Sequence, residues 1–144
     1  GIRDSSVTGV QTCALPIWYH TGDLGTMDTK GNVYIKGRSK NMLLSSNGQN
    51  IYPEEIEDKL NSMPMVVESI VVQRDSKLVG LVHPDFDEAK NMGFTEEDLL
   101  RIMEQNRTEL NQVLPVYSKL SAIEIHQEEF EKTPKKSIKR FMYS

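Results

Sequence analysis

Apolar and polar residues alternate over short stretches in the first third of the chain. Residues 25–36 place two apolar stretches on either side of Gly31-Asn32, a pair typical of tight turns. Residues 41–52 repeat this arrangement around the turn-forming sequence at positions 47–50. These patterns predict two small β-hairpins in succession.

The pattern then changes to the helical period. A helix is predicted to begin at Pro53, because a first helical turn tolerates proline and acidic residues follow it. Its apolar stripe consists of Ile56, Leu60 and Met63. A longer helix is predicted over residues 95–114, where Thr95 and Asp98 fit a capping box ahead of a second apolar stripe.

Three further stretches have strand character. Residues 66–73 and 77–83 are apolar runs joined by a short turn, and residues 121–125 alternate apolar and polar side chains. The order helix, strand, strand, helix, strand predicts an α+β fold, with a small three-stranded sheet and helices on one face.

Composition narrows the functional classes. The 144 residues are 38% hydrophobic and 26% charged, enough for one modest core. The net charge of -4 disfavours a nucleic-acid partner, and basic residues gather only at positions 132–140. A single cysteine, Cys13, permits no internal disulfide and no Cys/His metal motif. No signal peptide or apolar span is recognisable, so a cytoplasmic location is expected.

Residues 1–17 show neither the helical nor the strand period. They resemble the translation of a widely used short-read sequencing adapter, and we interpret them as an artefact outside the fold. Cys13 then has no biological role. The sequence from Trp18 onward is accordingly expected to be a piece of a longer protein.

Several motifs in the remaining chain could carry chemistry. Asp23 follows a glycine in the sequence TGDL, and a carboxylate there can accept two hydroxyl hydrogen bonds. The sequence GRSKNM begins at Gly37, Gly48 lies in a turn, and PEEIE begins at Pro53. With the ending FEKTPKKSIKRFMY, these motifs resemble the adenylate-forming enzymes, which include acyl-CoA synthetases, peptide-synthetase adenylation domains and luciferases.

The resemblance implies a division into domains. Residues 18–39 correspond to the end of the large AMP-binding domain, including a β-hairpin, and residues 40–144 to the small C-terminal lid domain. The rest of the large domain, with its phosphate-binding loop and acyl pocket, is then missing.

The resemblance also implies roles for four residues. Asp23 would receive the ribose hydroxyls of ATP and of the acyl-adenylate, and Arg38 would contact the same nucleotide. Lys40 would be the hinge about which the lid rotates, and Gly48 would border the channel for the pantetheine arm of CoA. A plain turn, a surface ion pair, a solvated lysine and an ordinary hairpin glycine are the structural alternatives.

The sequence departs from the family at the catalytic lysine. Many relatives end in PxTxxGKIxR, whose lysine reaches the substrate carboxylate and the α-phosphate. Aligning Thr133 and Arg140 with this motif puts Ser137 at the position of that lysine. We predict that Lys136 supplies the charge instead. The alternatives are that Lys135 or another neighbouring lysine serves, or that the lysine is dispensable or the protein is impaired.

The whole pattern is most similar to bacterial long-chain fatty-acid–CoA ligases. The intact enzyme would use ATP with Mg²⁺ and CoA to activate a fatty acid, with peripheral contact to a membrane, and the fragment alone would bind none of these and be inactive. One alternative is an adenylation domain that loads a carrier protein. Another is a noncatalytic module that binds through the basic tail, residues 132–140. No role is assigned to His20, His83 or His126.

Overall fold

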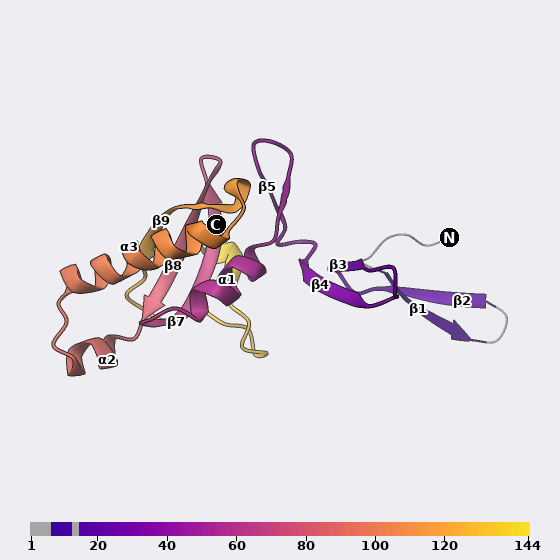
Figure 1. Ribbon diagram of the computed structural model, residues 1–144. Coiled ribbons are helices and arrows are strands. Elements are labelled where there is room, and N and C mark those ends of the chain that lie inside the picture. Colours follow the sequence, from indigo (N-terminus) through magenta and orange to yellow (C-terminus); the bar gives the residue numbers. More distant parts are fainter. Residues whose placement is uncertain (1–6, 13–14) are drawn as a thin grey trace.

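A computed structural model describes residues 7–12 and 15–144. Two regions are visible in Figure 1. Strands β1 to β4 form paired ribbons at one end, and the helices and the three-stranded sheet form a packed body at the other. The stretch that follows β4 connects them.

The first region consists of two antiparallel strand pairs. Strands β1 (Val7–Thr12) and β2 (Leu15–His20) pair with each other, and β3 (Asp23–Met27) pairs with β4 (Val33–Arg38). The β3–β4 hairpin was predicted at its turn, where Gly31 has φ +86°. Both strands extend further toward the hinge than the sequence pattern indicated. That β1 and β2 are strands was not predicted, and the assignment of residues 1–17 to an adapter stays a prediction.

The second predicted hairpin is shorter than expected. Only β5 (Leu43–Leu44) and β6 (Asn50–Ile51) pair, because Asn41 belongs to the turn that follows β4. Helix α1 (Pro53–Asn61) begins at the predicted proline. Met63 lies beyond the end of the helix, contrary to prediction, but still packs against the core.

The central sheet has the order β7-β8-β9. Strands β7 (Val66–Arg74) and β8 (Lys77–Pro84) are antiparallel, whereas β9 (Leu120–Ile125) runs parallel to β8. A parallel pair requires a long crossover, which the helices between the two strands provide. The predicted α+β fold with a three-stranded sheet is therefore confirmed.

The crossover contains two helices and a short turn. Helix α3 (Glu96–Val113) has the predicted capping box, with Thr95 and Asp98 exchanging hydrogen bonds at its start. Helix α2 (Phe86–Asn91) was not predicted. A single 3-10 turn, η1 (Val116–Ser118), leads into β9.

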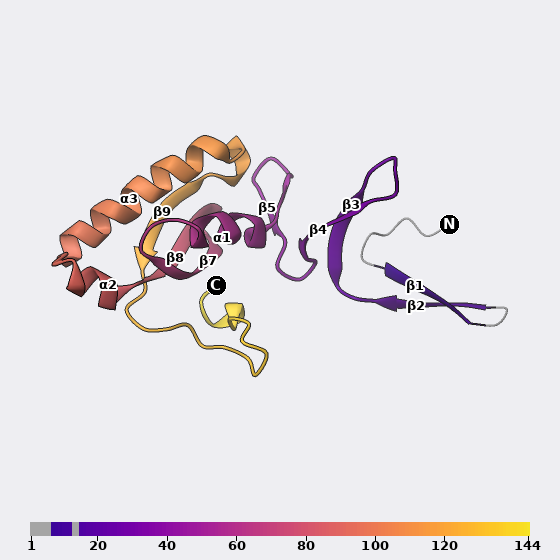
Figure 2. The same ribbon diagram turned by 60° about the horizontal axis from the view of Figure 1, so that its bottom comes forward.

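Each face of the sheet carries its own apolar cluster. On the first face, helices α1 and α3 bury ten residues together with the sheet: Ile51, Ile56, Leu60, Val71, Leu78, Val82, Met103, Leu110, Leu114 and Leu120. On the second face lie Ile70, Val72, Val79, Leu81 and Phe130, with Ile138 and Tyr143 packed against them. Neighbouring strand residues alternate between the clusters, as the strand period requires. Helices cover one face, as predicted, and the C-terminal segment covers the other (Figure 2).

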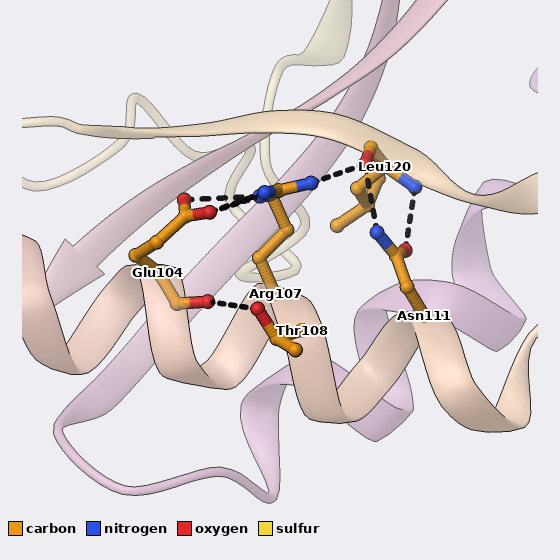
Figure 3. Close-up of polar contacts among 5 residues, drawn as sticks. All are labelled: Glu104, Arg107, Thr108, Asn111 and Leu120. Carbon is orange, nitrogen blue, oxygen red and sulfur yellow. Dashed lines mark hydrogen bonds and ion pairs between the residues drawn. The ribbon is translucent and has the colours of Figure 1, made fainter.

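Helix α3 also holds β9 through polar contacts (Figure 3). The Asn111 side chain donates to the carbonyl of Leu120 at 2.9 Å and accepts its N–H at 2.8 Å. Arg107 donates to the same carbonyl at 3.4 Å and is itself oriented by Glu104. An amide side chain thus completes the pairing of a backbone group where the strand begins.

Candidate functional site

The β3–β4 hairpin brings two of the predicted site residues together. Asp23 and Arg38 are partners in the strand register, and Arg38 Nε lies 3.0 Å from Asp23 Oδ1. Arg38 Nη1 also donates to the carbonyl of Thr21 at 2.9 Å. Gly22, between Thr21 and Asp23, has φ +79°, which the turn before β3 requires. A partly exposed carboxylate and guanidinium therefore share one end of the hairpin.

Lys40 lies in the turn directly after this pair. The carbonyl of Arg38 accepts the N–H groups of Asn41 at 3.0 Å and Met42 at 3.2 Å, which fold the chain back on itself. The Ser39 N–H donates to the carbonyl of Gly22 at 2.7 Å and joins the turn to β3. The Lys40 side chain is exposed, and its role as a hinge stays a prediction.

Two carboxylates of α1 contact β4 and the turn that follows it. Glu54 Oε1 accepts from Asn41 Nδ2 at 2.6 Å and from the Arg38 N–H at 3.5 Å. Glu55 accepts from Lys36 Nζ at 2.9 Å, and this hydrogen bond, with the charge of Glu55, raises the pKa of Lys36. A Cβ on Gly37 would lie 2.7 Å from Glu54 Oε2, so a larger residue there would require the Glu54 side chain to move. No motif in the sequence indicated these contacts.

A cavity of about 810 Å³ lies between the turn after β4, helix α1, strand β7 and the C-terminal segment. Its lining includes Arg38, Lys40, Glu54, Glu57, Lys136 and Arg140. Three residues predicted for the nucleotide site, the hinge and the catalytic charge thus share one cavity, although they come from distant parts of the sequence. Asp23 is tied to it through Arg38.

Gly48 lies elsewhere. It occupies the turn between β5 and β6 with φ +77°, and its N–H donates to the Ser45 carbonyl at 3.0 Å. A Cβ added there would meet nothing within 4 Å. The structure does not bring Gly48 to the cavity that Lys40 and Lys136 line. Two interpretations fit its position: a role in a different step of the reaction, or an ordinary turn.

Lys136 occupies the corner of a tight turn in the C-terminal segment. Its φ is +62°, in the left-handed region that favours glycine, and a lysine there costs roughly 1–2 kcal/mol. The Lys136 N–H donates to the Thr133 carbonyl at 2.8 Å, and the Thr133 N–H donates to the Ser137 carbonyl at 2.8 Å. In the alignment that puts Ser137 at the family's lysine, Lys136 takes the place of the preceding glycine. A glycine would adopt this left-handed φ without the cost that a lysine pays.

The same segment carries a largely buried ion pair that no sequence pattern indicated. Arg140 donates to both carboxylate oxygens of Glu57, at 2.5 Å and 2.8 Å. Glu57 belongs to the PEEIE motif, which was interpreted only as a helix start. The two residues stand 83 positions apart, so no local pattern connects them.

The histidines with described contacts have structural surroundings. His83 Nδ1 lies 3.0 Å from the carbonyl of His126, whose own ring stacks on Phe130. Among residues whose positions the structure describes, no group of three or more His, Cys, Asp or Glu side chains is arranged to hold a metal ion. Within the same part of the chain, no helix has the length and apolar character to cross a membrane.

The small α+β body that follows the hairpin can be compared with known protein families. Residues 40–143 match the AMP-binding enzyme C-terminal domain, and the chain belongs to this family. The 2-succinylbenzoate–CoA ligase of Bacillus mycoides is 41% identical over 88 residues, which are 61% of this chain and 18% of that protein. The chain thus spans less than a fifth of the length of this curated relative.

Solved structures agree with the fold. O-succinylbenzoate coenzyme A synthetase from Bacillus subtilis, in complex with AMP, has a TM-score of 0.65 and 22% identity over 88% of this chain and 24% of that one. The fatty acyl CoA synthetase of Mycobacterium tuberculosis has a TM-score of 0.54 and 26% identity over 87% of this chain and 23% of that one. The first of these similarities concerns the fold alone.

Proposed function

We propose that this chain supplies the mobile lid of an ATP-dependent acid–CoA ligase, which forms an acyl-adenylate and then passes the acyl group to CoA. The observation that carries the proposal is the single cavity lined by Arg38, Lys40 and Lys136. A cation-lined cavity next to a hinge suits a lid that must close over an anionic nucleotide and later move away. Membership of the family supports the same reaction.

In this proposal each residue has a distinct task. Asp23 accepts the ribose hydroxyls, and the ion pair with Arg38 fixes the orientation of its carboxylate. Lys136 directs its ammonium group toward the substrate carboxylate and the α-phosphate, where negative charge develops. Lys40 provides the backbone rotation between the two steps. ATP with its Mg²⁺, and CoA, would be bound largely by the large domain.

The acid is the finer part of the proposal. The name of the Bacillus mycoides relative, at 41% identity, favours an aromatic dicarboxylic acid like 2-succinylbenzoate. The long-chain fatty acid predicted from the sequence is the second candidate, and the mycobacterial fatty acyl CoA synthetase supports it at 26% identity. Sequencing the gene upstream of the Trp18 codon, and assaying the encoded enzyme with both acids, would decide between them.

The lid function can be tested by exchange. The lid of the Bacillus mycoides ligase is replaced by residues 40–144 of this chain, and AMP release is measured with ATP, CoA and 2-succinylbenzoate. We expect turnover by the chimera and none by the 144-residue chain alone. Lys136→Met should lower adenylation by about 10²- to 10³-fold, the cost of losing one charged donor. A folded chimera without turnover, or a fully active Lys136→Met chimera, would contradict the proposal.

A further inference from the structure

The Arg140 guanidinium contacts both a carboxylate and a backbone carbonyl of the lid body. It binds both oxygens of Glu57 and donates to the Val71 carbonyl at 3.0 Å, while Glu57 accepts the Val71 N–H at 2.7 Å. Helix α1, strand β7 and the C-terminal segment therefore meet at one buried point. Burial lowers the pKa of Arg140, but hydrogen bonds from Arg140 to Glu57 and the charges of Glu57 and Glu54 outweigh it and raise the pKa overall.

The loop that carries Lys136 begins and ends close to this point. Lys132 and Ile138 pair across the base of the loop, and the Lys139 N–H donates to the Glu131 carbonyl at 2.7 Å. Ile138 packs into the second apolar cluster. Lys132 forms an ion pair with Glu68 on β7. Apolar packing and a single-point ammonium contact allow sliding and rotation, whereas a bidentate guanidinium fixes both distance and angle.

We propose that Glu57 and Arg140 form a positioning pair, which sets the height and orientation of the Lys136 turn above the cavity. This inference rests on the proposed function, because it assumes that the Lys136 ammonium group acts in adenylation. Arg140 and Lys136 line the same cavity, and only three residues separate them in the sequence. A displacement at Arg140 is therefore transmitted to the turn through a short, hydrogen-bonded hairpin.

The pair should matter for one half-reaction more than for the other. Lys136 is needed when the acyl-adenylate forms, but not when CoA attacks an adenylate that is already made. Misplacing a reacting group by about 1 Å can cost on the order of 10²-fold in rate. Arg140→Lys keeps the charge but loses the bidentate geometry, and Glu57→Gln keeps the shape but loses the charge, so both should misplace the turn.

The first experiment uses the 144-residue chain itself. Amide hydrogen exchange is followed by NMR in the unsubstituted chain, in Arg140→Lys and in Glu57→Gln. We expect the protection of the Thr133 and Lys136 amides to fall by about 10-fold or more, while the amides of the sheet keep theirs. Arg74→Lys is the matched control, because Arg74 pairs with Glu124 on the surface and contacts the C-terminal segment only through the Tyr143 carbonyl.

The second experiment measures both half-reactions in the chimera. We expect both substitutions to slow adenylation about 10- to 100-fold and to leave thioester formation from synthetic acyl-adenylate within about 3-fold. Equal losses in both half-reactions, or an undisturbed turn in the exchange experiment, would overturn the inference. An unsubstituted chimera without turnover would instead count against the proposed function, and hydrogen exchange in the 144-residue chain would still decide whether the pair positions the turn.

Discussion

The lid body buries its large apolar side chains, whereas the β3–β4 hairpin leaves several of them exposed. Leu60 and Leu110 in the lid are 0% exposed, whereas Met27 and Ile35 in the hairpin are 69% and 66% exposed. Both regions have regular strands and well-formed turns. The difference therefore lies in packing, since the lid closes around its own residues and the hairpin has no covering layer among the residues that the structure describes.

This difference bears on how the two regions relate to a larger enzyme. Contiguous exposed apolar side chains commonly mark a surface that meets another protein surface. In the proposed function, that other surface belongs to the large domain. In the same proposal the lid rotates, and a domain that completes its own core can rotate without exposing apolar surface to water.

Truncating an apolar side chain should produce the largest difference between the two regions in the free energy of unfolding. Leu60→Ala removes a fully buried side chain and is expected to lower the free energy of unfolding by about 2–5 kcal/mol. Ile35→Ala in the hairpin should change it by no more than about 0.5 kcal/mol. Urea denaturation followed by helical circular dichroism measures both. A comparable loss at Ile35 would mean that the hairpin packs on the lid in solution.

A pair of asparagine substitutions sharpens the comparison. Asn111→Ala leaves the buried backbone of Leu120 short of hydrogen bonds and should cost about 1–3 kcal/mol. Asn32→Ala in the hairpin turn removes an exposed contact to Asp28 and should stay within about 0.5 kcal/mol. The same denaturation measurement applies. Equal effects would contradict the view that only the lid depends on internal polar contacts.

Lowering the pH should produce the smallest difference in stability between the lid and the hairpin. Hydrogen bonds from the Thr95 backbone and side chain lower the pKa of Asp98 from its ordinary 3.8, aided by the charge of Arg101 and opposed by slight desolvation. A lowered folded-state pKa stabilises the lid above the unfolded-state pKa, and this contribution is lost as pH falls through the folded-state pKa.

Asp98→Asn should therefore reduce the acid-dependent part of lid stability, measured by urea denaturation at about pH 6 and about pH 3. Asp28 in the hairpin also has a lowered pKa, caused chiefly by its hydrogen bonds with Asn32. Because Asp28 lies outside the lid, Asp28→Asn should leave the helical signal unchanged at both pH values. An identical response to the two substitutions would argue against separate behaviour of the regions.

Local signals explain which elements could be predicted. The capping box of Thr95 and Asp98, the apolar runs of the sheet and the turn at Gly31 each lie within a few residues, so the sequence shows them directly. Helix α2 was missed because it has six residues and buries only Ala89, which is too little for a recognisable apolar stripe. The sequence pattern likewise gave no sign that β1 and β2 are strands.

The functional residues also fall into those that the sequence indicated and those that it could not. The resemblance predicted roles for Asp23, Arg38, Lys40, Gly48 and Lys136, and those roles stay predictions, although the structure places three of the five on one cavity. The contact of Arg140 with Glu57 could not be predicted, because tertiary folding alone brings such distant residues together. The left-handed φ of Lys136 could have been suspected from its alignment with a glycine.

The C-terminal segment on the second face of the sheet has a consequence for biosynthesis. Phe130, Ile138 and Tyr143 complete the apolar cluster there, so this layer cannot form until residue 143 has left the ribosome. A nascent lid would pass through a stage in which Ile70, Val72 and Leu81 face water, a state open to chaperone capture and proteolysis. Truncation before Phe130 would leave the chain permanently at that stage.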